Sequence, residues 1–273
     1  MLLESICARG RRSGSHTTVL TPIFDTTMPY RVRCIIPHDR YCRFDGLTLV
    51  PEEINAVEVD EEDRRLTETK LILVGQDGER RESSLLELSN LLGFAYLTHL
   101  AWMDEKDLRL MPVTWGLPQY SSLDTGEEAV SPTAADLGII QQLENGEIHT
   151  QIEIRYIDPA MGWGVFASSP LPTGEFIGEY VGIVLQTQNP GPYSLNFPCL
   201  DGGHEINASD TGNLMRFVNH SSQPNASFQR VFHEHIVHTV VRLVRPVPAG
   251  GQICVDYSPS YWIGRGVVPQ PNL

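Results

Sequence analysis

The stretch GNLMRFVNHSSQPN, at residues 212–225, decides the fold of this chain of 273 residues. It is the third of four short motifs that follow one another along the chain. The first is MGWGVFA at residues 161–167, the second is EYVG at 179–182, and the fourth is CVDYSPSYW at 254–262. A lone GxG is usually a turn and EYVG alone is an ordinary strand end. The information therefore lies in the ordered set.

Short β-like runs separated by Gly, Pro and Asn surround these motifs. They lie at residues 152–157, 165–167, 176–184, 226–232, 236–244 and 252–255. Several short strands at close spacing predict a mostly β domain. No GxGxxG or GxxxxGK[ST] element occurs, so neither a Rossmann dinucleotide site nor a P-loop is indicated. With 41% hydrophobic and 20% charged residues, the composition is that of a globular protein and excludes collagen-like, coiled-coil and wholly disordered chains.

Over about residues 151–263 the chain resembles the SET-domain protein lysine methyltransferases. The resemblance rests on GWG, EYxG, RFxNHSxxPN and a DY followed by an aromatic residue and Trp. It implies a mostly β SET fold of small curled β-sheets. It also implies a knot-like C-terminal threading, in which the NHS segment passes beneath a loop formed by the last motif.

The resemblance further implies S-adenosyl-L-methionine as the methyl donor. Backbone groups of the first motif would line this cofactor, and the Asn-His pair of the third motif would hold its amino acid and adenine parts. Arg216 is expected to order the local fold, with a cofactor contact as the alternative. The residues expected at the cofactor are Met161, Gly162, Trp163, Gly164, Tyr193, Arg216, Asn219, His220 and Trp262.

Three tyrosines are the candidate catalytic residues. A lysine ammonium, with a reference pKa of about 10.4, has no lone pair, so the site must favour the neutral amine. Tyr257 is the first choice for the catalytic hydroxyl that orients this amine, and a buried core tyrosine is the alternative. Tyr193 falls where the family places a tyrosine between donor and lysine. Tyr261 falls at the position that limits methylation, and a tyrosine there favours mono-methylation.

No metal site is predicted. Many relatives bind zinc through a Cys of the third motif and a Cys-rich tail, but here Ser222 takes that position and the tail has no Cys. We expect Trp262 and the tail to close the adenine pocket instead. His233, His235 and His238 lack a sufficient set of carboxylate or Cys partners, so a metal is disfavoured there.

Charge favours a basic partner. The net charge is −14, from 20 basic and 34 acidic residues, which argues against direct nucleic acid or membrane binding and fits a basic protein or peptide, with a histone tail favoured. Five scattered cysteines and the lack of a membrane span predict an intracellular protein, nuclear or cytoplasmic. Delivery into a host cell stays open if the source is bacterial. Oligomeric state also stays open.

The predicted organisation begins with a flexible tail at 1–28 and an α+β N-terminal domain of no named family at 29–130. That domain has strands at 31–36 and 71–74. A helix capped by Ser83 or Ser84 follows, with Leu85, Leu88, Leu92 and Tyr96 at helical spacing. Residues 116–132 look like a linker. A connecting helix at 131–150, the SET domain at 151–263 and a tail at 264–273 complete the chain.

The sequence thus predicts an S-adenosylmethionine-dependent protein-lysine N-methyltransferase. Two alternatives stay open. One is a catalytically weak SET-fold binding or adaptor module, and the other is an enzyme that acts on a non-histone protein.

Overall fold

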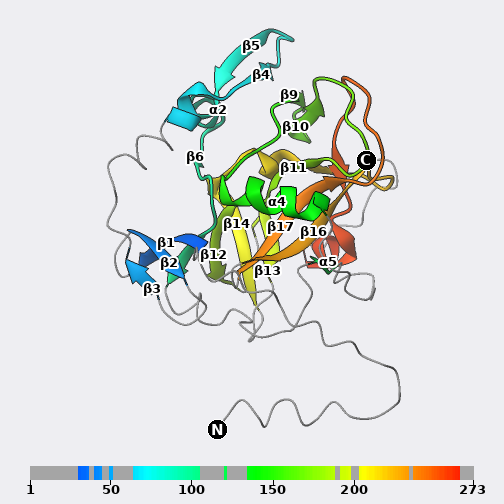
Figure 1. Ribbon diagram of the computed structural model, residues 1–273. Helices are drawn as coiled ribbons and strands as arrows, with labels where there is room; N and C mark the ends of the chain where they lie inside the picture. The colour runs from blue at the N-terminus through cyan, green and yellow to red at the C-terminus, as the bar shows by residue number, and fades with distance from the viewer. Residues whose placement is uncertain are drawn as a thin grey trace, which may run out of the picture.

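The computed structural model describes residues 30–36, 40–44, 49–51, 64–104, 120–121, 134–187, 191–197, 203–233 and 236–264 (Figure 1). The described chain is mostly β, with few helices and small curled sheets, which confirms the predicted fold class. The predicted tails lie outside the described residues, except for residue 264. No helix in the described part of the chain is long and apolar enough to cross a membrane.

The largest sheet in the described part of the chain joins strands from residues 30–104 with strands from residues 182–212. Its order is β13-β14-β12-β7-β1-β2-β3, and β6 pairs with β14 outside this path. The strands are β1 (Tyr30–Ile36), β2 (Arg40–Phe44), β3 (Leu49–Pro51), β6 (Ala95–Tyr96), β7 (Ala101–Asp104), β12 (Gly182–Gln186), β13 (Ser194–Phe197) and β14 (His204–Gly212).

The described residues also form three smaller sheets. One has the order β10-β9-β4-β5, another β11-β17-β16-β8, and the last is the pair β15-β18. Their strands are β4 (Lys70–Val74), β5 (Arg80–Ser84), β8 (Tyr120–Ser121), β9 (Ile152–Asp158), β10 (Gly162–Ala167), β11 (Phe176–Glu179), β15 (Asn219–His220), β16 (Ala226–His233), β17 (Ile236–Leu243) and β18 (Cys254–Val255).

Helical elements flank these sheets in the described part of the chain. They include α2 (Leu85–Leu92), α4 (Ala134–Glu144), the 3₁₀ helix η2 (Leu214–Phe217) and α5 (Ser258–Gly264). Figure 1 shows α4 lying across the sheet of β11, β17 and β16. Ile139 and Leu143 of α4 pack there against Phe176, Val231 and Val240, which form a small core of their own.

The main hydrophobic core is built by both parts of the chain. Leu73 and Trp102, from before residue 130, are buried in one cluster with Ile154 and Ile206. The ring of Trp102 meets that of Phe197 edge-on, with centroids 6.3 Å apart. Burying these large side chains together supplies hydrophobic free energy to both parts at once.

A separate α+β domain at residues 29–130 is not confirmed. Strand β7 pairs in parallel with β12 on one side and with β1 on the other, β4 runs parallel to β9, and β6 runs parallel to β14. An ion pair adds to these ladders, because Arg80 Nη2 lies 2.6 Å from Oε2 of the buried Glu153. The N-terminal strands complete the sheets of the C-terminal part. The segment boundaries themselves stay a prediction.

Of the secondary-structure predictions for the chain before residue 150, the strands and one helix start are confirmed, but the end of that helix is wrong. Strands β1 and β4 confirm the runs at 31–36 and 71–74, and α4 confirms a helix within 131–150. The start of α2 at the Ser84 cap is also confirmed. The predicted extension of its stripe to Tyr96 is wrong, because Gly93 adopts a left-handed conformation (φ 77°) that ends the helix, and Tyr96 belongs to β6. Strand β8 lies inside the predicted linker.

Candidate active site

The third and fourth motifs lie side by side. Strand β15 pairs in parallel with β18, so that Asn219 faces Cys254 and His220 faces Val255. Asn225 ties the same two segments together, because its side chain donates to the Gln252 carbonyl (2.8 Å) and accepts from the Cys254 amide (2.9 Å). This is the contact expected of the predicted C-terminal threading, and it places His220 next to the start of the DY motif.

Tyr257 is held from both ends. Its hydroxyl donates to the carbonyl of Val218 at 2.7 Å, and its backbone N–H donates to Nδ1 of His220 at 3.2 Å. Burial raises the pKa of the Tyr257 phenol above its ordinary value, and neighbouring tyrosines add to the rise. The hydroxyl is therefore protonated at neutral pH. Since its proton points to Val218, its lone pairs are available to accept a further hydrogen bond.

An aromatic cluster surrounds this tyrosine. The Tyr261 ring lies 4.6 Å from that of Tyr257, and the Trp262 ring stacks on Tyr257 with centroids 6.1 Å apart. Trp262 also meets the His220 ring edge-on at 5.0 Å. Helix α5 begins directly after Tyr257 and places Tyr261 and Trp262 against the rings of Tyr257 and His220. The structure therefore groups four residues that the sequence predicted to act together.

Arg216 lies between three aromatic rings. Its guanidinium carbon is 4.0 Å from the centroid of Tyr193, 4.7 Å from Phe94 and 5.3 Å from Phe217. The residue is only 8% exposed, and its Nη2 donates to the Ser209 carbonyl at 2.7 Å. Burial lowers the pKa of Arg216, while Tyr193 and Tyr180 oppose the shift. The arginine remains charged, and the ring faces stabilise that charge.

Two tyrosines link Arg216 to the Tyr257 cluster. The hydroxyl of Tyr180 donates to the carbonyl of Tyr193 at 2.8 Å, and burial raises the Tyr180 pKa. The hydroxyl of Tyr261 points to the carbonyl of Pro192 at a longer 3.4 Å. The turn at residues 191–194 is therefore shared by the two clusters, with Tyr193 on the side of Arg216.

The first motif contributes backbone at the same place. Asn219 Nδ2 donates to the carbonyl of Trp163 at 3.0 Å, which joins β10 to β15. Gly162 has φ 69° and open space where a side chain would start, so its backbone can approach a ligand. Gly164 differs, because a Cβ there would lie 2.8 Å from Ile157 and 2.9 Å from Gln252. Packing within the chain therefore favours glycine at position 164, and its predicted cofactor contact stays a prediction.

His238, in the sheet of β11, β17, β16 and β8, contacts a buried carboxylate. His238 is buried on β17, and its Nδ1 lies 2.7 Å from Oε1 of the buried Glu179. The side chains of His233 and His235 lie outside the described residues. In the part of the chain that the structure describes, no group of three His, Cys, Asp or Glu side chains could hold a metal ion.

Sequence reasoning missed two residues of this region. Tyr180 stands inside the EYVG motif, which was noted only as a landmark, so a signal for it was present. Phe94 gave no signal, because a lone phenylalanine after a helix is usually core. Its position on Arg216 depends on the pairing of β6 with β14, where Leu97 N–H also donates to the Gly212 carbonyl at 2.7 Å.

The family model of the SET domain matches residues 162–258. This part of the chain is a SET domain.

Among curated proteins, the histone-lysine N-methyltransferase Su(var)3-9 of Drosophila melanogaster is 30% identical over 114 residues, which are 35% of this chain and 18% of that protein. The histone-lysine N-methyltransferase EHMT1 of Mus musculus is 33% identical over 116 residues, 39% of this chain and 9% of that protein. The matched segment is thus a small part of the length of these relatives.

Among solved structures, the ATXR5 SET domain in complex with histone H3 di-methylated on R26 aligns with a TM-score of 0.49 and 16% identity. The alignment covers 64% of this chain and 85% of that one.

Proposed function

We propose that this chain is an S-adenosyl-L-methionine-dependent protein-lysine N-methyltransferase. The observation that carries the proposal is the position of Tyr257, whose hydroxyl donates to Val218 while its backbone contacts His220 beside Asn219. A purely structural tyrosine would not need the surrounding set of Tyr193, His220 and Trp262. Similarity to histone-lysine methyltransferases over the same segment supports the proposal.

The residues present fit the cofactor. Nε and Nη1 of Arg216 are buried and make no hydrogen bond within the described residues, so they suit an anionic group such as the cofactor's carboxylate. Open backbone at Gly162 suits a close approach. We infer that these groups, together with Met161, Trp163, Asn219 and His220, hold the cofactor, and that Trp262 stacks on its adenine. When bound, the cofactor supplies a methyl group on a sulfonium.

The chemistry asks the protein to present a neutral amine in line with that methyl group. Burial among aromatic rings favours the neutral form of a lysine, and the Arg216 charge does the same. One amine N–H can donate to the Tyr257 oxygen, because the hydroxyl proton is already used by Val218. The amine lone pair would then be free to take the methyl group that the bound cofactor would supply, with the neutral thioether as leaving group, and the proton lost from the methylated ammonium would pass to solvent.

We further propose that Tyr261 limits the product to mono-methyl-lysine. Its ring lies against Tyr257, and its hydroxyl can hold a water in the space that an added methyl group needs. Tyr261→Phe should shift the products toward di- and tri-methyl-lysine in mass spectra. Unchanged product ratios would refute this role for Tyr261.

The substrate that we propose is a basic protein segment, with a histone tail favoured, because the chain carries a net charge of −14 and such a charge steers basic partners. Similarity to histone-lysine methyltransferases supports this choice. An intracellular location, nuclear or cytoplasmic, goes with it. A non-histone protein substrate and a non-catalytic adaptor are the competing possibilities.

The test is methyl transfer from labelled S-adenosylmethionine to intact histones and to a total cell lysate, with wild type beside Tyr257→Phe. We expect labelling of a discrete protein that falls about 100-fold or more in the variant. Calorimetry should show that both proteins bind the cofactor. Absence of labelling together with absence of cofactor binding would favour the adaptor instead.

A further inference from the structure

Glu205, on β14, is a buried carboxylate with one oxygen unused. The side chain is 4% exposed, and its Oε1 accepts from Ser194 Oγ at 2.8 Å and from Asn207 Nδ2 at 3.0 Å. Oε2 is also buried, and it has no hydrogen-bond partner within the described residues. Neither the fold nor the proposed methyl transfer uses this oxygen.

A buried carboxylate oxygen without a hydrogen bond lowers the stability of the fold. Burial of a charged group costs several kcal/mol unless a counter-charge or hydrogen bonds compensate for it. The two neutral donors compensate for one oxygen only. A cationic group brought next to Glu205 would remove the remaining cost. A guanidinium suits this place better than an ammonium, because it is more weakly hydrated and its planar donors match both carboxylate oxygens.

The position of Glu205 connects it to the proposed lysine site. The residue lies on β14 opposite Asn196 of β13, which is the terminal strand of the largest sheet in the described part of the chain. Ser194, which donates to Glu205, directly follows Tyr193. The Glu205 charge is also close enough to add to the raised pKa of Tyr180. The carboxylate thus lies beside the turn that carries Tyr193.

The alternation of side chains in a strand separates two faces here. Tyr193 and Leu195 pack toward the main core, while Ser194 lies between them and contacts Glu205. An extended substrate segment along the free edge of β13 would alternate in the same way. When its target lysine points toward Tyr257, a flanking side chain points to the face of Ser194 and Glu205.

We propose that Glu205 binds an arginine side chain of the substrate close in sequence to the target lysine. This inference rests on the proposed function and adds a specificity-determining residue to it. The length of an arginine side chain suits a carboxylate that solvent does not reach. Glu205 would then select basic segments of the form found in histone-like tails over segments with a lone lysine.

The test is peptide binding, measured by fluorescence anisotropy in the presence of S-adenosylhomocysteine. The probes are 15-residue Gly/Ala/Ser peptides with one central lysine and one arginine, moved through the three positions on either side. A second set carries citrulline, which has the shape of arginine without its charge. For wild type we expect one position at which arginine binds about 30-fold tighter than citrulline, the size typical of a buried charge pair.

Glu205→Gln should reduce that ratio to about one. Glutamine keeps an acceptor for Ser194 and Asn207, so the fold should survive, which thermal unfolding will check. The matched control is Glu82→Gln, which removes one exposed charge on β5 and should leave the ratio unchanged. If Glu205→Gln does not fold, Glu205→Asp withdraws the charge by one methylene and should lower the ratio in the same direction.

Two results would overturn the role of Glu205. One is a wild-type protein that binds arginine and citrulline peptides equally at every position, and the other is a ratio that survives substitution of Glu205. Because the readout needs no methyl transfer, it is independent of the Tyr257→Phe assay. A wild-type protein that labels its substrate but shows no arginine preference would sink this inference alone, whereas absent labelling would sink the proposed function.

Discussion

The C-terminal part at residues 151–263 and the strands at residues 30–104 differ in what their sequences reveal. The first part carries all four motifs, and the second carries none. In the structure, however, strands of the second part lie within the sheets of the first, and Phe94 contacts Arg216 directly. A SET domain recognised by its motifs can therefore depend on neighbouring strands that no motif marks.

The largest expected effect comes from Trp102, which is fully buried on β7 between β1 and β12. Trp102→Ala removes an indole from the core shared by both parts. We expect the free energy of unfolding to fall by about 3–5 kcal/mol, in one cooperative transition. Urea denaturation followed by tryptophan fluorescence and circular dichroism measures this.

Leu91→Ala is the control for that experiment. Leu91 is 58% exposed on α2, so its loss should change the free energy of unfolding by less than about 0.5 kcal/mol. Two separate transitions in Trp102→Ala, with cofactor binding kept after the first, would mean that the N-terminal strands fold independently. The SET domain would then not depend on those strands for its stability.

Phe94 tests whether the N-terminal part also acts on the site. Phe94→Leu keeps an apolar side chain but removes the ring face on Arg216. A buried cation–π contact is worth about 2 kcal/mol, so we expect the dissociation constant for S-adenosylmethionine to rise about 10-fold. Calorimetry measures this constant, with Leu91→Ala again as the control. Wild-type affinity in Phe94→Leu would restrict the N-terminal part to a structural role.

The local features were predictable and the long-range ones were not. Ser84 predicts the start of α2 because a cap and its helix are adjacent in sequence. Gly93 could have predicted the end of the helix in the same way. The grouping of Asn219, His220 and Tyr257 followed from the family resemblance. Strand β14 was missed, because HEINASDTG shows no clear alternation and buries Glu205 beside Ile206. Whether an acid is buried depends on β12 and β13, which its own neighbours in sequence do not specify.

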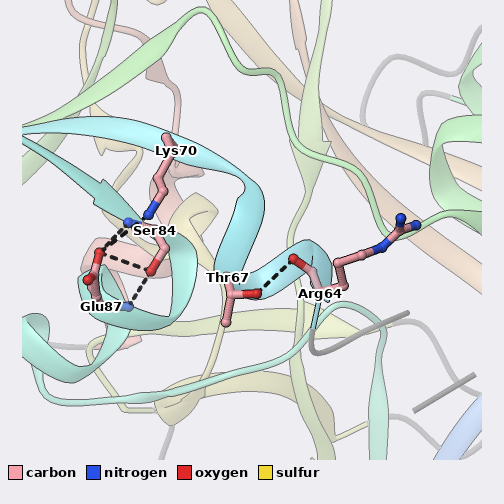
Figure 2. A network of polar contacts seen from close by, with 5 residues as sticks. All are labelled: Arg64, Thr67, Lys70, Ser84 and Glu87. Carbon is pink, nitrogen blue, oxygen red and sulfur yellow. Dashed lines mark hydrogen bonds and ion pairs between the residues drawn. The ribbon is translucent and has the colours of Figure 1, made fainter. Parts of the chain in front are cut away.

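The smallest expected effect concerns the capping box at the start of α2, which lies wholly within the N-terminal part. Figure 2 shows Glu87 accepting from the Ser84 backbone N–H (2.7 Å) and hydroxyl (3.0 Å), while the Glu87 N–H donates to Ser84 Oγ (3.2 Å). Lys70 Nζ lies 3.9 Å from the same carboxylate. The backbone hydrogen bond, the hydroxyl and then Lys70 lower the pKa of Glu87 below its usual 4.5.

A lowered pKa fixes the direction of the pH dependence. The ionised Glu87 stabilises the fold fully above the unfolded pKa of 4.5, and this contribution is lost as the pH falls through the lower folded value. Glu87→Gln should therefore lower the free energy of unfolding near pH 7, modestly because glutamine still closes the capping box, and should reduce the further loss of stability as the pH falls below about 4.5. Urea denaturation from pH 7 to about pH 3 measures both slopes, with Glu82→Gln as the control. Ser84→Ala should lower the free energy of unfolding by about 1 kcal/mol near pH 7. Identical acid slopes in wild type and Glu87→Gln would show that the carboxylate contributes nothing beyond the cap.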